Sequence, residues 1–234
     1  MKRYYLLLLF SFFCVGLLYP QKKRVKNQPY GDQKVFHYGF TMGLHSQDLE
    51  FFHTGAVTDN GESWFAEIPN HGVGFNVGII GDLYLTSFLN LRFTPSLYFG
   101  DKSITFREQN SGKEVHTNLR SNYLMLPLHL KYSSDRLNNI RPYLIAGPSI
   151  GFELSRKRGA ELMSRPMAVF IEVGVGCNLY FRYFKLCPEL KFCFGLNNVL
   201  EKDRKDLTIL DYAKYTDALS RMTSRLVVLS FNFE

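Results

Sequence analysis

The sequence predicts an all-β fold, a transmembrane antiparallel β-barrel of about eight strands. Three observations favour this fold class: long segments in which apolar and polar residues alternate, an alternating order of short and long connections, and a high aromatic content. A period of two places successive side chains on opposite faces of a strand. We therefore expect one face of the sheet to meet lipid and the other to line the barrel interior.

The clearest alternation lies between residues 169 and 196. Apolar side chains stand two apart from Val169 to Phe181, with mostly small or polar residues between them. After a turn at residues 182–183 the alternation resumes from Phe184 to Leu196. Each arm reaches the ~9–11 residues that a tilted transmembrane strand needs, whereas a soluble strand has about 5–6. The segment predicts a hairpin of two long strands.

The same pattern recurs along the chain, and the connections alternate in length. Strands are expected at residues 36–45, 73–79, 89–99, 124–132, 141–152, 169–181, 184–196 and 227–233. Short turns are expected near residues 85–88, 133–139 and 182–183, and long polar loops at 46–71, 107–121, 155–166 and 197–221. Short turns on one side and long loops on the other are typical of bacterial outer-membrane barrels. Both termini then lie on the short-turn side, in the periplasm.

Prolines fall inside several of these strands. Proline removes a donor from the hydrogen-bond ladder and belongs at strand starts, edges or bulges. We therefore expect bulges or shortened strands, and register shifts of one residue, at some of the following positions: Pro95, Pro127, Pro142, Pro148 and Pro188.

The chain divides into three parts. Residues 1–20 read as a secretory signal peptide, because Lys2 and Arg3 precede an apolar run at 6–18 that is short for a membrane-spanning helix. Residues 21–35 are polar and basic, and we expect a flexible periplasmic segment there. Residues 36–234 form the predicted outer-membrane barrel.

Composition agrees with a barrel in lipid. The mean hydropathy is only −0.12, as expected where lumen residues dilute lipid-facing ones. The 21 Phe and 14 Tyr fit the aromatic girdles of such barrels. The net charge of +7 is scattered, without a nucleic-acid motif, so contact with outer-membrane lipid fits and a nucleic-acid partner is not expected. Outside the leader, Cys177, Cys187 and Cys193 are an odd number without metal-type spacing, and we expect free thiols.

Charged residues also occur on the expected interior face. An eight-stranded barrel is filled by its own side chains, so a salt-bridged internal plug is the favoured interpretation. A narrow pore or a charge-lined cavity is the alternative. The residues concerned are Arg92, Lys131, Arg141, Lys185 and Lys191, with Glu172 and Glu189.

No motif marks a catalytic, cofactor-binding or metal-ligating residue, and we expect no cofactor. The histidines show neither HExxH nor another tight metal spacing. A lipid- or lipopolysaccharide-modifying barrel enzyme remains an alternative, built on the first long loop. Its candidate residues are His45, His53 and His71 with Asp48, Glu50, Asp59, Glu62 and Glu67. A third interpretation is a structural or adhesion barrel whose long loops bind an external ligand.

Two neighbouring segments carry a family resemblance. Residues 122–132, NYLMLPLHLKY, and residues 141–149, RPYLIAGPS, resemble the "YL-x-hP-hhhK" and "RPY-hh-G" patterns of the PorT-like outer-membrane barrel family of Bacteroidota. Residues 174–176 and 188–196 are similar to that family's later strands, and the resemblance spans about residues 36–234. The closing residues 230–234, SFNFE, resemble a barrel-assembly signal, except that Glu234 follows the aromatic Phe233.

The resemblance implies a function. Members of this family belong to the type IX secretion system, which exports proteases and gliding adhesins across the outer membrane. By resemblance this chain is an accessory barrel of that machinery, smaller than its translocon, non-enzymatic, and in contact with other secretion-system proteins. The family supplies no catalytic residues.

Overall fold

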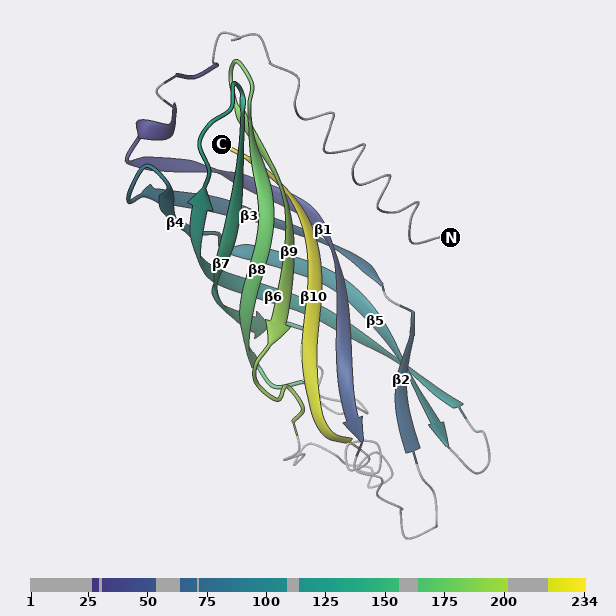
Figure 1. Cartoon of the computed structure of the whole chain (residues 1–234). Coiled ribbons are helices and arrows are strands. Elements are labelled where there is room, and N and C mark those ends of the chain that lie inside the picture. Colours follow the sequence, from purple (N-terminus) through teal and green to yellow (C-terminus); the bar gives the residue numbers. More distant parts are fainter. Residues whose placement is uncertain are drawn as a thin grey trace, which may run out of the picture.

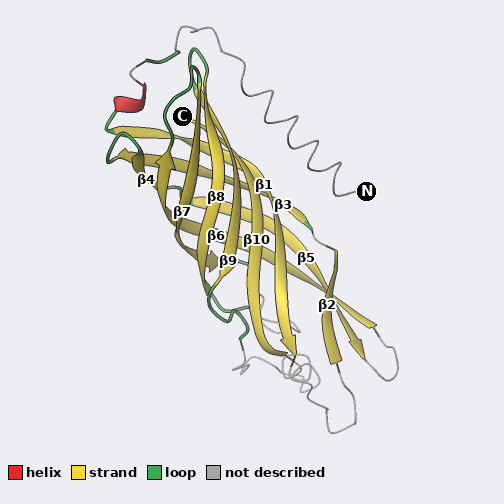
Figure 2. Ribbon diagram, viewed as in Figure 1, coloured by secondary structure: helices red, strands yellow, loops and turns green. Residues whose placement is uncertain are grey.

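The structure is a computed structural model and describes residues 27–29, 31–53, 64–70, 72–108, 114–155, 164–201 and 219–234. One antiparallel sheet curls into an elongated barrel (Figures 1 and 2). Its strands are β1 (Phe36–His53), β2 (Trp64–Asn70), β3 (Val73–Tyr84), β4 (Leu89–Phe93), β5 (Ser96–Glu108), β6 (Glu114–Ser133), β7 (Ile140–Glu153), β8 (Met167–Tyr180), β9 (Lys185–Gly195) and β10 (Leu219–Phe233). Among the described residues no helix is long and apolar enough to cross a membrane.

The wall of the barrel closes between β1 and β3. The sheet order is β1-β10-β9-β8-β7-β6-β4-β3-β5-β2, with further pairings of β1 with β3 and of β5 with β6. β2 and β3 lie one after the other along β5, and β4 and β5 lie one after the other along β6. The ten strand segments of the described chain therefore occupy eight positions around the barrel wall, because β2 with β3 and β4 with β5 lie end to end. We call each of these eight positions a stave. The predicted fold class is confirmed.

The period-two alternation decides which side chains face outward. Tyr38, Ile79 and Leu144 are 79%, 65% and 57% exposed, whereas the neighbouring Ile80 and Tyr143 are each only 3% exposed. In a barrel of this kind, the exposed apolar side chains form the band that contacts lipid. The predicted inward and outward faces of the strands are confirmed.

Three of the five prolines coincide with gaps in a hydrogen-bond ladder, whereas Pro127 and Pro142 are paired with Ser149 and Cys177. Thr94 and Pro95 separate β4 from β5. The pairing of β6 with β7 skips Pro148, between Pro127↔Ser149 and Leu130↔Ala146. The pairing of β8 with β9 skips Pro188, between Gly176↔Glu189 and Leu179↔Leu186. A residue without an amide hydrogen is tolerated where no ladder bond is needed. The expected interruptions are confirmed, and the faces do not slip.

Two expected loops are largely strand, and that prediction was wrong. β1 continues to His53, β2 covers Trp64–Asn70, and β5 and β6 pair through Arg107↔Glu114. These extensions project at the lower end of Figure 1. Polar and charged residues interrupt the alternation of apolar residues in these extensions, so the hydropathy pattern does not predict strands there. The remaining residues of the two expected loops, 54–63, 71 and 109–113, lie outside the described ranges.

The short-turn end carries the C-terminus and the first described residues (Figure 1). Asn27 donates its amide N–H to Asn139 Oδ1 at 2.8 Å and its side-chain amide to the Tyr180 carbonyl at 3.0 Å. Arg136 donates to the Gln28 carbonyl at 3.0 Å. Residues 27–29 and 31–35, which belong to the expected flexible segment, contact the rim of the barrel. Residues 1–26, including the predicted signal peptide, lie outside the described residues.

Candidate functional site

A buried ion-pair network fills the lumen near the short-turn end. Arg92 in β4 is 1% exposed and donates from Nε to Asp82 Oδ2 at 2.9 Å. Its Nη1 lies 3.4 Å from Glu189 Oε2 in β9, and its Nη2 pairs with the Glu234 carboxylate. β9 and β4 lie opposite each other, because three staves separate them in either direction around the barrel. The contact between Arg92 and Glu189 therefore joins opposite walls of the barrel.

Lys131 and Tyr143 extend this network. Lys131 Nζ lies 3.6 Å from Asp82 Oδ2 and donates to Asn178 Oδ1 at 3.2 Å. The Tyr143 hydroxyl donates to Glu189 Oε2 at 2.8 Å. The Lys131 ammonium also lies 4.4 Å from the centre of the Tyr143 ring, at the distance of a cation–π contact. Side chains from five staves thus converge on the same volume.

A second group of charges lies beside the first. His129 Nε2 lies 3.0 Å from Glu172 Oε2, and Lys191 Nζ lies 3.8 Å from both Glu172 and Glu189. The buried bases of the whole network equal its acids in number: Arg92, Lys131, Lys185 and Lys191 against Asp82, Glu172, Glu189 and Glu234. Buried charges are tolerated when they are paired in this way. The balance favours the plug interpretation over a charge-selective pore.

Arg141, predicted with this set, lies apart from it. Its Nη1 is 3.5 Å from Asp32 Oδ1, and its Nε donates to the Ser134 carbonyl at 2.7 Å. Arg141 therefore ties the N-terminal segment to the rim and does not join the central network.

Sequence reasoning missed Asp82 and Glu234. The expected strand ended at Ile79, and Asp82 was not predicted to face the lumen. β3 instead continues to Tyr84. Glu234 was noted only as a departure from a terminal signal, yet its side chain is 2% exposed and turns inward. The signal that identifies Asp82 is the outward alternation of Ile79, Gly81 and Leu83.

Glu234 lies past the end of β10 and stays ionised. Burial alone would raise the pKa of its side-chain carboxyl, but the positive charges of Arg92, Lys131 and Lys185 outweigh that effect. Together they hold its pKa well below the usual value.

A cluster of apolar side chains lies in the half of the lumen away from the short turns. It draws on several staves and includes Leu49, Tyr98, Met125 and Phe170. Leu200, which follows β9, is fully buried in the same cluster. Polar side chains are buried there too, because the side-chain amide of Gln47 donates to Ser224 Oγ at 3.1 Å. The lumen thus has a charged half at the short-turn end and a mixed, largely apolar half at the other end.

The histidines of the hydrolase alternative are not brought together among the described residues. His45 is 3% exposed inside the lumen, with its ring centre 4.9 Å from that of Tyr98. Glu50 is 36% exposed and pairs with Arg225 at 2.6 Å. His53 ends β1, Glu67 lies in β2, and His71, Asp59 and Glu62 fall outside the described residues. The described ranges also hold no group of three metal-ligating side chains, and Cys177, Cys187 and Cys193 are free thiols there.

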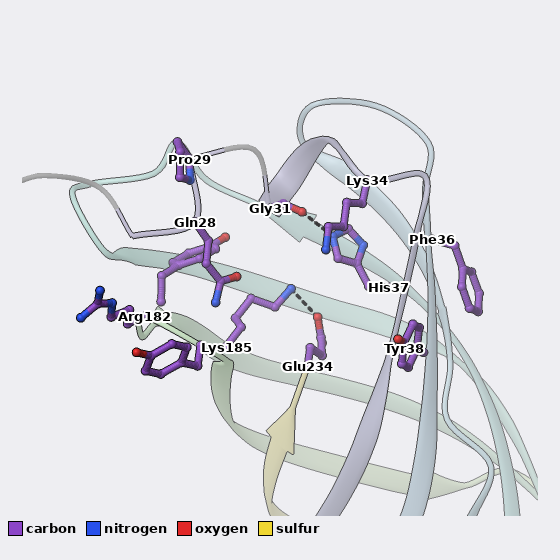
Figure 3. Close-up of a pocket in the computed structure, with 12 residues that line it drawn as sticks. Gln28, Pro29, Gly31, Lys34, Phe36, His37, Tyr38, Arg182, Lys185 and Glu234 are labelled. Atoms are coloured by element: carbon purple, nitrogen blue, oxygen red, sulfur yellow. Dashed lines mark hydrogen bonds and ion pairs between the residues drawn. The ribbon is translucent and has the colours of Figure 1, made fainter.

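A pocket of about 580 Å³ opens at the short-turn end (Figure 3). Its lining comes from the N-terminal segment, the start of β1, the β8–β9 turn and the C-terminus. Lys185 and Glu234 form an ion pair in this pocket, which links it to the central network.

A family model described as outer membrane protein beta-barrel domain matches residues 21–201. The chain belongs to this family of outer-membrane β-barrel domains. Its place is therefore the outer membrane, and the apolar band on the barrel is its lipid-facing surface.

Solved structures of other outer-membrane barrels share the fold. Neisserial surface protein A is 10% identical, with 85% of this chain and 96% of that chain covered and a TM-score of 0.45. OprG from Pseudomonas aeruginosa is 10% identical, with 85% and 93% covered and a TM-score of 0.42. Ail of Yersinia pestis is 12% identical, with 84% and 96% covered and a TM-score of 0.36. These likenesses concern the fold alone. No curated protein matches the chain.

Proposed function

We propose that this outer-membrane barrel is a non-enzymatic accessory component of the type IX secretion system, required for export of proteases and adhesins. Two things support the proposal: the motif resemblance to the PorT-like family of Bacteroidota, and the Arg92–Glu189 contact across the lumen. A lumen spanned by side chains is not a conduit for protein. The barrel therefore acts through its surfaces, on partner proteins of the same machinery.

Some of the residues that carry the resemblance lie at the short-turn end. Lys131 and Tyr143 belong to the central network, and Arg141 holds Asp32 at the rim. All of them stabilise the half of the barrel that includes the short turns. We place this end in the periplasm, as in other outer-membrane barrels, and propose that partner proteins bind there.

The test is a strain that lacks this protein. Type IX cargo should accumulate in the periplasm and reappear outside the cell when the wild-type chain is supplied from a plasmid. Normal export of cargo in the deletion strain would contradict the proposal. Outer-membrane fractionation of the complemented strain serves as the control for correct insertion of the barrel.

The projecting strands favour one second candidate function, binding of an external ligand. The β5–β6 pairing extends from Gly100↔Ser121 to Arg107↔Glu114. The sequence pattern predicted a loop at residues 107–121. A paired ribbon of this length offers a rigid surface outside the membrane. Replacing residues 103–118 by a short turn should leave cargo export unchanged if this ribbon serves ligand binding alone.

A further inference from the structure

The barrel wall has a notch at the C-terminal end of β10. The pairing of β1 with β10 stops at Phe40↔Phe233, although β1 begins at Phe36. On the other side, Glu234 and Lys185 still exchange two backbone hydrogen bonds, of 2.7 and 2.9 Å. Residues 36–39 therefore extend past the end of β10 with no strand beside them on that side among the described residues.

The pocket of about 580 Å³ occupies this notch (Figure 3). Gln28, Gly31 and Lys34 of the N-terminal segment line one side of it, and the start of β1 and the β8–β9 turn line others. Two of its outward-facing residues, Tyr38 and Tyr183, are 79% and 84% exposed. Two others, Lys185 and Glu234, turn into the lumen. The pocket therefore opens from the membrane-facing surface toward the mouth of the barrel.

The pocket carries an excess of positive charge. Lys185 is neutralised by Glu234, which is also the only acid that lines the pocket among the described residues. Lys34 and Arg182 are exposed and form no ion pair with another described residue. Arg182 stands 5.5 Å from the centre of the exposed Tyr183 ring. Basic residues beside exposed tyrosines are the pattern that proteins present to lipid head groups at the membrane interface.

His37 presents an unused acceptor in the same place. Its Nε2 lies 2.7 Å from the Gly31 carbonyl, so Nε2 carries the proton and donates it to that oxygen. In the neutral ring Nδ1 is then an acceptor. Nδ1 is buried and has no hydrogen-bond partner among the described residues. This atom has almost no accessible surface, so a ligand in the pocket does not contact it directly.

An aromatic surface leads from the notch along the outside of the barrel. The rings of Phe40 and Phe233 stack at 4.9 Å, and those of Phe184 and Phe233 lie 6.2 Å apart. Phe181 stacks on Phe184 at 4.9 Å. These rings flank the end of β10 and belong to the lipid-facing surface. A ligand with acyl chains contacts this surface while its head group enters the pocket.

We propose that the notch binds one glycerophospholipid of the leaflet at the short-turn end. The phosphate enters the pocket that Lys34 and Arg182 line, and the acyl chains follow the aromatic surface beside β10. Since Lys34 belongs to the N-terminal segment and Arg182 to the β8–β9 turn, the lipid joins the two. The proposal depends on the position of the barrel in the membrane and not on the role in secretion.

The test is native mass spectrometry of the purified full chain in detergent, titrated with phosphatidylglycerol. We expect the double variant Lys34→Gln, Arg182→Gln to bind the first lipid about tenfold more weakly than the wild type. The control is Arg165→Gln, Arg221→Gln, which removes the same charge from exposed positions at the opposite end. It should bind as the wild type does. Heat-dependent electrophoretic mobility verifies that each variant is folded.

Three outcomes would overturn the proposal. One is equal binding by the wild type and the Lys34, Arg182 variant. Another is an equal loss of lipid affinity in the control variant, which would indicate unspecific attraction of the lipid to the total positive charge of the protein. The third is binding of glycerol 3-phosphate as tightly as the lipid, which would assign the pocket to a soluble phosphate compound.

Discussion

Arg92 of β4 and Glu189 of β9 meet across the lumen, with 3.4 Å between Nη1 and Oε2. Their staves stand on opposite sides of the ring, so one ion pair connects the two walls. The same guanidinium also holds Asp82 and Glu234. Arg92 is thus the centre of the network, and the network is what closes the charged half of the lumen.

Arg92→Leu should destabilise the barrel strongly, because three buried carboxylates lose a shared partner. We expect a loss of about 3–5 kcal/mol in the free energy of unfolding, measured by urea titration in lipid vesicles. The matched control is Arg225→Leu, which breaks the exposed Arg225–Glu50 pair of 2.6 Å. That loss should stay below about 1 kcal/mol. Similar losses in both variants would contradict a central role for Arg92.

Gly147→Ala should disturb the pairing of β6 with β7. A Cβ at Gly147 would stand 2.0 Å from the Leu128 carbonyl oxygen, a backbone atom that cannot move alone. We expect a loss of about 1–3 kcal/mol in the same urea titration, as for other overpacked sites. At Gly81 the nearest atom is the flexible Phe36 Cζ at 3.4 Å, so Gly81→Ala is the control. Equal free energies of unfolding for the two variants would contradict the close approach of the Leu128 carbonyl to Gly147.

A charged side chain on the lipid-facing surface should lower the free energy of unfolding most at the middle of a stave. Val173 lies near the centre of β8 and is 41% exposed, whereas Leu154 follows the end of β7. Val173→Arg should lower the free energy of unfolding in vesicles by about 2–4 kcal/mol, and Leu154→Arg by about 0–1 kcal/mol. The reverse order would show that the membrane does not surround this part of the barrel.

The contribution of Glu234 should depend on pH. Because its folded-state pKa lies below the usual 4.5, its carboxylate stabilises the fold at pH values above 4.5. That contribution declines as the pH falls from 4.5 toward the lower folded-state pKa. The difference in unfolding free energy between the wild type and Glu234→Gln should therefore be largest at neutral pH and shrink at acid pH. A difference that stays constant down to pH 3 would contradict ionic pairing of Glu234.

Much of the fold follows from local chemistry and could be predicted. The alternation around Val169 and Phe192 places lipid-facing side chains correctly, because a lipid-facing surface must be apolar at every second residue. The same logic identified Arg92, Lys131, Lys185, Lys191, Glu172 and Glu189 as interior residues.

Two residues of the network were missed although the period of two reaches them. Asp82 faces inward because β3 continues past Gly81 to Tyr84, and Glu234 faces inward because its backbone continues the pairing with Lys185 after the outward-facing Phe233. The alternation of apolar residues in the projecting part of β5 and β6 is limited to a few positions such as Ile104, Phe106 and Val115, so the hydropathy pattern does not predict strands there. The hydrogen bonds of Asn27 and Arg136 at the rim link residues more than a hundred positions apart. No local sequence pattern predicts such contacts.

The central claim is a sealed outer-membrane barrel that acts through its surfaces, and ion conductance tests it most directly. The purified wild-type protein, inserted into a planar lipid bilayer, should give no stable conductance steps. The double variant Arg92→Ala, Glu189→Ala should open the charged half of the lumen and increase brief current events. Stable, reproducible conductance steps from the wild type would contradict the account, because a lumen closed by the Arg92–Glu189 contact does not conduct.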